Sequence, residues 1–517
     1  MRIPSLIPTF VHSYIRTFLH SYIKKLYGAT KPKGGINKLR KTKIVCTIGP
    51  ATDNREVLKE LMEAGMNVAR INFSHGNYKD QEDRINMFKE VRAELNLPIS
   101  LLLDTKGPEI RIGKFADNEV FLNDGARFTL LNEDMLGDDT KVSISYKTLY
   151  QDVSAGQTIL VNDGTIELAV EEISEKDIVC RVVHGGKLTN LKSANVPDLK
   201  VNLPEVTEKD VEDIKYGIEA GFDYIAASFV RKPEDVHEVR KVLQENNGEH
   251  IKVISKIENR EGVDNFNEIL KVSDGIMVAR GDLGVEIPME EVPILQKQFI
   301  KKTYKAGKPV ITATQMLESM ITNPRPTRAE VSDVANAIYD GTSAIMLSGE
   351  TASGAFPIEC VKVMNKTAIT TEESINYWER CERREHELEN YDYLFNMNYS
   401  VCTVAEHVNA KAIIAYTETG NTARMISSFS PECPIFAITQ NEVTYRQTGL
   451  CFGIIPMLFP RQGSIDDLIK IGIEELRNNE YLQQGDTILI AGGPKIVKDL
   501  DITEGGLNTV MGGIVKL

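Results

Sequence analysis

Short apolar runs alternate with helix-like segments along most of the chain. The runs lie at 43–48, 67–73, 99–104, 223–229, 251–257, 275–279, 309–314 and 344–348. Such alternation predicts parallel strands joined by helices. Runs such as SLLLD and AIMLS are apolar at nearly every position, which is typical of a closed sheet that is filled inside and covered by helices outside. These eight strands predict an α/β fold built on a (β/α)8 TIM barrel.

Two segments depart from this pattern. Between about Pro108 and Leu203, apolar and polar residues alternate and DG, GD and GG turns recur, which predicts an inserted all-β domain. From about Tyr391, a helix-like segment precedes AIIAY, and PIFAIT, TILIA and GGIVKL follow, which predicts a C-terminal α/β domain. We therefore divide the chain into an N-terminal extension (1–37), a barrel (38–107 and 204–375), a β-barrel lid (108–203) and a C-terminal α/β regulatory domain (376–517).

Composition narrows the classes of function. At 517 residues, two to four domains are expected. A formal charge of -14 disfavours nucleic acid as a partner, because a polyphosphate would be repelled over most of the surface. No apolar run reaches the roughly 18 residues of a membrane span, so no membrane partner is expected. The seven cysteines form no CxxC pair, which favours a reducing compartment, the cytoplasm.

The N-terminal extension has an unusual charge pattern. It contains Arg and Lys repeatedly, and no acidic residue precedes Asp53. Apolar and basic residues between Ile3 and Tyr27 have amphipathic helical spacing. Two interpretations stay open: an organelle transit peptide, or else a solvated extension or a wrongly assigned start of the chain.

Polar residues close many of the predicted barrel strands. In a barrel of this kind such residues meet at one mouth. Any one of them could be a helix cap or half of an ion pair, but Lys256 and Glu258 lie two apart and so point to the same face. With Asp282 from the next strand, two carboxylates could hold a magnesium ion. Lys256 and Arg70 would then supply the positive charge that phosphoryl transfer requires.

The motifs at these strand ends resemble those of the pyruvate kinase family. The runs are TKIVCTIGPAT, VARINFSHG, LLLDTKGPEIR, ISKIEN, MVARGDLGVEIP, TATQMLESM, NPRPTRAEV and SAIMLSGETASG, in the family's order, and the resemblance extends from about Arg40 to the C-terminus. It implies a cytoplasmic homotetramer that transfers the phosphoryl group of phosphoenolpyruvate to ADP, giving pyruvate and ATP, the last step of glycolysis. The implied cofactors are Mg²⁺, or Mn²⁺, and K⁺.

The resemblance also implies a role for each residue of the mouth. Arg70 and Lys256 would hold the phosphoryl group, and Thr314 would help to deliver the proton that converts enolpyruvate to pyruvate. Glu258 and Asp282 would bind Mg²⁺. The substrate would also be bound by Ser228 and by the segment Ala279, Arg280, Gly281 and Asp282, whose backbone N–H groups could cradle its carboxylate.

A potassium site and a nucleotide site follow from the same resemblance. Oxygens of Asn72, Ser74, Asp104 and Thr105 match the family's K⁺ ligands. Glu109 stands where K⁺-independent members carry Lys, so we expect a K⁺ requirement. For ADP, the matching residues are Asn72, Phe73, Ser74, His75, Arg111 and Lys192. The run KSANVPD, which contains Lys192, lacks both glycines of the family's KGVN(L/V)PG, so lid closure and the role of Lys192 stay open.

A candidate effector site lies in the C-terminal domain. Thr417, Thr419, Gly420, Asn421 and Thr422 are predicted between a strand and a helix, where free N–H groups suit a phosphate. The loop resembles the family's effector-phosphate site, for a sugar phosphate or nucleotide. The alternative is a simple hydroxyl-rich helix cap, because Glu418 places an unfavourable charge beside an anion.

Two rival functions compete with phosphoryl transfer. A metal-dependent aldolase would also need Lys, Glu and Asp around a divalent ion, although the inserted lid and the potassium ligands argue against it. A catalytically silent scaffold on the same fold is the second rival. The joint presence of Arg70, Lys256, Glu258, Asp282 and Thr314 argues against silence.

Overall fold

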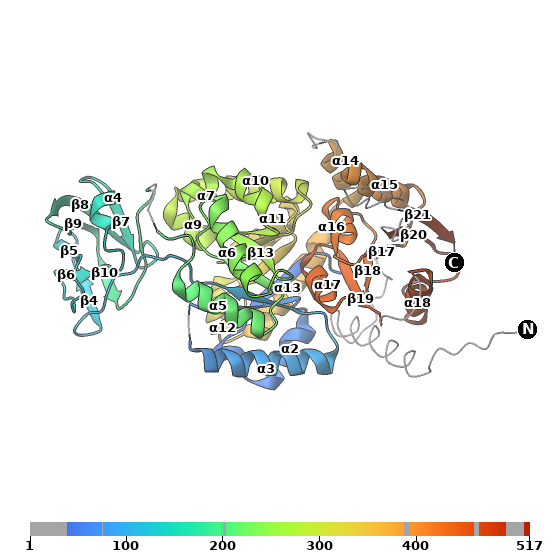
Figure 1. Ribbon diagram of the computed structural model, residues 1–517, viewed down its shortest axis with the longest axis horizontal. Coiled ribbons are helices and arrows are strands. Elements are labelled where there is room, and N and C mark those ends of the chain that lie inside the picture. Colours follow the sequence, from blue (N-terminus) through green and yellow to red (C-terminus); the bar gives the residue numbers. More distant parts are fainter. Residues whose placement is uncertain are drawn as a thin grey trace, which may run out of the picture.

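A computed structural model of the chain describes residues 39–74, 76–197, 199, 203–386, 393–459, 465–492 and 511–516. The predicted extension 1–37 and the predicted nucleotide ligand His75 lie outside the described residues. Three bodies lie in a row: the β-rich insertion on the left, the barrel in the centre and the C-terminal domain on the right (Figure 1).

A closed parallel barrel forms the centre of the molecule. Its strands follow the order β1, β16, β15, β14, β13, β12, β3, β2 around the ring. Their bounds are β1 (Lys43–Thr47), β2 (Val68–Asn72), β3 (Ser100–Asp104), β12 (Tyr224–Ala227), β13 (Lys252–Ile257), β14 (Gly275–Ala279), β15 (Val310–Ala313) and β16 (Ala344–Leu347). All eight predicted barrel strands are therefore confirmed, with ends that differ by one or two residues.

Helices surround the barrel because most of them carry one apolar face that the sheet buries. Their bounds are η2 (Pro50–Thr52), α2 (Arg55–Ala64), α3 (Tyr78–Leu95), α5 (Glu208–Glu219), α6 (Pro233–Glu245), α7 (Arg260–Asp264), α8 (Phe266–Val272), α9 (Arg280–Glu286), η3 (Met289–Glu291), α10 (Val292–Lys305), η4 (Glu318–Ile321), α11 (Arg328–Asp340), α12 (Gly349–Ala352) and α13 (Pro357–Glu372). Asparagine and threonine side chains cap several of them, such as Asn54 before α2 and Thr327 before α11.

The C-terminal domain packs against the end of the barrel at which the strands begin. Leu450, in η5 (Thr448–Leu450), is fully buried in the same apolar cluster as the inward-facing residues of the strands, such as Val45 and Met277. Beside it, Arg446 Nε donates to Asp223 Oδ1 at 2.8 Å and Tyr224 Oη donates to the carbonyl of Gln447 at 2.5 Å. The barrel and this domain therefore share part of one core, at the end opposite the predicted site.

The insertion is built of β-strands with a core of its own. Its elements are β4 (Glu119–Leu122), β5 (Arg127–Leu131), β6 (Lys141–Ser143), the one-turn helix α4 (Leu149–Asp152), β7 (Thr158–Val161), β8 (Ile166–Ser174), β9 (Asp177–His184), β10 (Gly186–Thr189) and β11 (Ala194–Asn195). The described strands form a six-stranded sheet, with β11 and β6 at its edges, and a separate pair, β10 with β4. Residues 111 and 112 join the two edges of the larger sheet, because Arg111 bridges Ser193 beside β11 and Ile112 bridges Ile144 beside β6. The β-barrel form of the lid stays a prediction.

The C-terminal domain is a five-stranded sheet between helices. Its elements are α14 (Tyr377–His386), α15 (Tyr393–His407), β17 (Ala412–Tyr416), α16 (Asn421–Ser428), β18 (Ile435–Thr439), α17 (Glu442–Gln447), β19 (Ile454–Leu458), α18 (Ile465–Asn478), β20 (Thr487–Gly492) and β21 (Met511–Lys516). β19 is absent from the predicted strands. It contains Pro456 and lies at the edge of the sheet, where a residue without an N–H group is tolerated.

Candidate active site

A buried group of ionised side chains lies at the carboxyl ends of the barrel strands. Arg70 lies two residues before the predicted K⁺ ligand Asn72, which ends β2, and Asp104 ends β3. Arg70 Nε donates to Asp104 Oδ2 at 2.5 Å, and Lys256 Nζ donates to Asp104 Oδ1 at 3.1 Å. Lys256 also donates to Ser228 Oγ at 2.8 Å and lies 2.9 Å from Glu258 Oε1. The structure thus brings together five predicted residues from four strand ends.

Asp104 is the counter-ion of both cations in this group. Its side chain is 1% exposed. Burial alone would raise the pKa of Asp104, but the charges of Arg70 and Lys256 outweigh burial and hold this pKa below its usual value. In turn, burial opposes the charge of Lys256, while Asp104, Glu258 and Asp282 raise its pKa well above the ordinary value. Lys256 therefore stays an ammonium ion at neutral pH.

Glu258 has the properties of a ligand for a divalent cation. Burial and, to a smaller extent, the nearby charge of Asp282 raise the pKa of Glu258 to about 8, against the opposing charge of Lys256. Its Oε2 accepts a hydrogen bond from the Phe229 amide at 2.6 Å. Its Oε1 is buried and receives no hydrogen bond from the described residues, although Lys256 lies close by. An oxygen with an unused lone pair beside a second carboxylate fits Mg²⁺ or Mn²⁺.

Thr314 is held in a backbone conformation that costs free energy. Its φ is 69°, in the left-handed region, which is rare for a β-branched residue. Its hydroxyl donates to the Ala313 carbonyl at 2.6 Å and accepts from the Gly281 amide at 2.7 Å. Strain of about 1–3 kcal/mol of this kind is common at functional sites. The contact fixes Thr314 against the first turn of α9, which also carries Asp282.

Two predicted members of the substrate cradle are engaged elsewhere. The Arg280 guanidinium pairs with Asp333 at 2.8 Å and donates to the carbonyl of Thr314 at 2.7 Å, so this side chain braces the Thr314 turn. The Gly281 amide donates to the Thr314 hydroxyl. The neighbouring strand end therefore supplies an acceptor for this N–H group, and the carboxylate cradle of Ala279 to Asp282 stays a prediction.

The predicted potassium ligands lie side by side on neighbouring strands. Asn72 and Asp104 are register partners in the β2–β3 pair, and Thr105 follows directly. Asn72 Oδ1 accepts from the Ser74 amide at 2.9 Å, which folds the turn back over the strand end. This set offers only oxygen donors, which fits a hard cation. The Phe73 side chain is 4% exposed and packs against Phe222, so only its backbone can face a nucleotide.

The lid places Arg111 and Glu109 above the mouth. Arg111 Nη2 pairs with Glu109 Oε2 at 2.7 Å, and its Nη1 donates to the Leu191 carbonyl at 2.8 Å. Burial raises the pKa of Glu109, with the charge of Arg111 opposing it and that of Asp282 adding to it. The Lys192 carbonyl accepts from the Ile112 amide at 2.9 Å, so Lys192 lies on a segment that is paired with the start of the lid.

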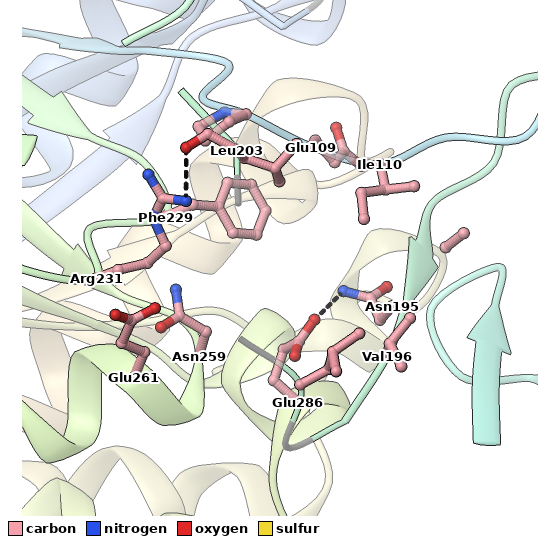
Figure 2. Close-up of a pocket in the computed structure, with 13 residues that line it drawn as sticks. Glu109, Ile110, Asn195, Val196, Leu203, Phe229, Arg231, Asn259, Glu261 and Glu286 are labelled. Carbon is pink, nitrogen blue, oxygen red and sulfur yellow. Dashed lines mark hydrogen bonds between the residues drawn. The ribbon is translucent and has the colours of Figure 1, made fainter. Parts of the chain in front are cut away.

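A cavity of about 50 Å³ separates the lid from the barrel. Figure 2 shows Ile110 and Val196 on its lid side, and Phe229, Asn259 and Glu286 on its barrel side. Arg231, which was not among the predicted residues, donates to the carbonyls of Leu203 and Pro204 at 3.0 Å each and thereby ties the returning lid connection to the barrel. Arg231 follows a predicted barrel strand by two residues, and this position could have identified it from the sequence.

The candidate effector loop has the predicted place in the fold. It joins β17 to α16, and Gly420 has a φ of 84° before the helix. The Glu418 carbonyl accepts from Thr444 Oγ1 at 2.8 Å, and Arg424 Nη2 donates to Asn421 Oδ1 at 3.0 Å. The N-cap residue of α16 is Gly420, which has no side chain that could cap the helix.

Together, these features define a (β/α)8-barrel enzyme of phosphoryl transfer, in which two cations and two carboxylates meet beside an inserted β domain. The family model described as "Pyruvate kinase, barrel domain" matches residues 39–361, and that described as "Pyruvate kinase, alpha/beta domain" matches residues 396–510. The pyruvate kinase of Clostridium acetobutylicum is 48% identical over 457 residues, which cover 88% of this chain and 96% of that protein. That of Clostridium perfringens is 49% identical with the same coverage, and that of Bacillus licheniformis is 49% identical over 88% of this chain and 78% of that protein. The chain belongs to the pyruvate kinase family.

Proposed function

We propose that the barrel mouth transfers the phosphoryl group of phosphoenolpyruvate to ADP and yields pyruvate and ATP, the last step of glycolysis. One observation carries this proposal: Lys256 is buried between Asp104 and Glu258, with Arg70 on the other side of Asp104. Fixed cations in a buried site stabilise the negative charge of a migrating phosphoryl group far better than solvated ones. In this proposal, Arg70 and Lys256 orient the phosphate and Ser228 keeps Lys256 in place.

Glu258 and Asp282 would hold Mg²⁺ or Mn²⁺. When bound, this ion neutralises developing charge and polarises the substrate oxygens. The chain's own contribution is to keep Glu258 fully buried, with its Oε2 fixed by the Phe229 amide and its Oε1 turned toward Lys256. Phe229 can donate from there because its φ is 55°, so the backbone turns back toward the strand end.

Thr314 would bind the substrate and hold the proton that enolpyruvate takes up. Its hydroxyl already bridges the Gly281 amide and the Ala313 carbonyl, so its position relative to α9 is fixed before substrate arrives. The predicted K⁺ ligands are Asn72, Ser74, Asp104 and Thr105. Among them, Asp104 also orients Arg70 through its carboxylate. Arg111, Lys192 and the 72–75 segment would bind ADP.

Regulation and assembly are further parts of the proposal. The loop from Thr417 to Thr422 would bind a phosphorylated effector, a sugar phosphate or a nucleotide. The resemblance to the family supports a homotetramer. All seven cysteines are buried free thiols, which supports a reducing compartment, the cytoplasm. Among the described residues, no helix is long and apolar enough to span a bilayer.

The deciding experiment is an assay of the purified full-length chain with phosphoenolpyruvate, ADP, Mg²⁺ and K⁺. We expect ATP and pyruvate to form together, and each omission to stop the reaction. Retro-aldol cleavage without ATP formation would instead support the aldolase. Binding of phosphoenolpyruvate without turnover, in a preparation that is folded, would support the scaffold and overturn the proposal.

A further inference from the structure

We propose that Asn195 of the lid and Glu286 of α9 form a latch that positions the lid over the active site, an inference that rests on the proposed function. Asn195 Nδ2 donates to Glu286 Oε1 at 2.7 Å (Figure 2). Asn195 ends β11, the lid strand that follows Lys192, and Glu286 is the last residue of α9. The bond thus joins the lid to the helix that begins at the substrate cradle.

The helix α9 connects the latch to the reacting groups. It has seven residues, so it is about 10 Å long and makes about two turns. Its first turn carries Asp282, and its Gly281 amide is bonded to Thr314. A change in the position of Glu286 therefore acts on the proposed metal ligand and on the proposed proton donor through a single short element.

A second part of the lid lies near the same end of α9. A Cβ added to Gly164, in the β7–β8 turn, would lie 3.7 Å from Val285 Cγ1, so the turn approaches the helix closely. The turn and the strand β11 are also tied to each other, because Ser193 Oγ donates to Asp163 Oδ1 at 3.1 Å and accepts from the Asp163 amide at 3.2 Å. The β7–β8 turn and β11 are therefore linked to each other, and both lie beside the end of α9.

Ser193 explains why this chain can depart from the family's lid motif. The position corresponds to the first glycine of KGVN(L/V)PG. Here a hydroxyl fastens the Lys192–Asn195 segment to the β7–β8 turn, and side chains two apart on a strand share a face, so Ser193 and Asn195 turn to the same side. Side-chain hydrogen bonds of Ser193 and Asn195 therefore anchor this segment, and one of them comes from the position at which the family motif has a glycine.

The latch contributes to the free-energy difference between the closed and the open lid. A hydrogen bond to a carboxylate at a half-buried site changes an equilibrium by about three- to thirtyfold. Because ADP binds between the lid and the barrel in this proposal, loss of the latch raises the KM for ADP by about that factor. Saturating ADP closes the lid by its own binding energy, so kcat stays within about twofold.

The test compares Asn195→Ala, Glu286→Ala, the double variant and the conservative Glu286→Gln in the full-length protein. We expect both single alanine variants to raise the KM for ADP to the same extent, and the double variant to raise it no further. Glu286→Gln keeps the acceptor oxygen, so its KM for ADP should be close to that of the wild type. Glu268→Ala, which removes an exposed carboxylate of α8 that pairs with Lys271, is the matched control and leaves the KM unchanged. Additive effects, or a fall in kcat at unchanged KM, would overturn the latch.

A readout without catalysis separates this proposal from the proposed function. The seven native cysteines are buried, so spin labels can be placed on cysteines introduced at the exposed positions Glu133 of the lid and Gln244 of the barrel. In the protein without ligands, Glu286→Ala should broaden the distance distribution between the labels, while Glu268→Ala should not. An unchanged distribution refutes the latch even if the enzyme is active, and a broadened one supports it even if ATP formation fails.

Discussion

Replacement of Lys256 by Met removes the central cation of the site and keeps an unbranched side chain of similar length. In the structure, this ammonium group contacts Asp104 Oδ1, Glu258 Oε1 and Ser228 Oγ, all within 3.1 Å. We expect phosphoryl transfer to fall by about 10³- to 10⁵-fold, the effect of removing a cation that stabilises a transferring phosphate. This factor corresponds to about 4–7 kcal/mol of transition-state stabilisation.

The same change is expected to spare the second half of the reaction. Protonation of enolpyruvate depends on Thr314, whose contacts run to Gly281 and Ala313 and do not include Lys256. The assay therefore measures two rates on one preparation: ATP formation from phosphoenolpyruvate and ADP, and conversion of enolpyruvate to pyruvate. We expect the first rate to be nearly abolished and the second to stay measurable.

Stability must be followed in parallel, because the variant leaves two carboxylates without their shared cation. Unpairing a buried ion pair costs about 3–5 kcal/mol, but Glu258, with a pKa of about 8 even beside Lys256, takes up a proton and lowers this cost. A melting temperature close to that of the wild type shows that the rates compare folded proteins. Lys241→Met, at an exposed lysine of α6 paired with Glu238, is the matched control. Wild-type transfer in folded Lys256→Met would refute the role of Lys256.

Three further predictions concern the cations, Thr314 and a buried lysine. Replacement of K⁺ by Na⁺ in the assay should lower kcat. Glu109→Lys should restore activity in the absence of K⁺, because its ammonium group would supply the positive charge of the missing ion. Equal rates in Na⁺ and K⁺ would contradict the potassium site. Thr314→Val should lower enolpyruvate protonation by about 10²-fold and Thr314→Ser should retain most of it, since only the hydroxyl is needed; equal loss in both would point to strain instead. Burial, aided by the charge of Arg40, lowers the pKa of Lys43 to about 7, whereas an unfolded lysine titrates near 10.4. Between these values the unfolded chain binds more protons, so the stability of the wild type relative to Lys43→Met should rise by up to about 1.4 kcal/mol per pH unit from pH 7 to 10; a constant difference in melting temperature across this range would contradict it.

Local periodicity was sufficient to predict the barrel. Each strand is a short apolar run and each helix has one apolar face, so the eight strands could be located within one or two residues of their observed ends. The strand β19 was not predicted because Pro456 interrupts its pattern, and only its place at the sheet edge makes that residue acceptable. The lid was predicted as β-structure, but the separate pair of β4 with β10 was not predicted, since strand pairing has no local signature.

The sequence by itself determined which side chains stand at the mouth. In parallel strands of a closed barrel, the residues near the carboxyl ends must converge, and Arg70, Asp104, Lys256 and Glu258 all lie within two residues of such an end. Which of them pair was decided by the tertiary structure alone. Asp104 lies 34 residues from Arg70 and 152 from Lys256, and only barrel closure makes it the counter-ion of both. Likewise, the lid contact of Asn195 with Glu286 spans 91 residues, and the strain at Thr314 arises from neighbours that no local pattern specifies. Local propensity acts over a few residues, whereas these contacts depend on how distant segments meet.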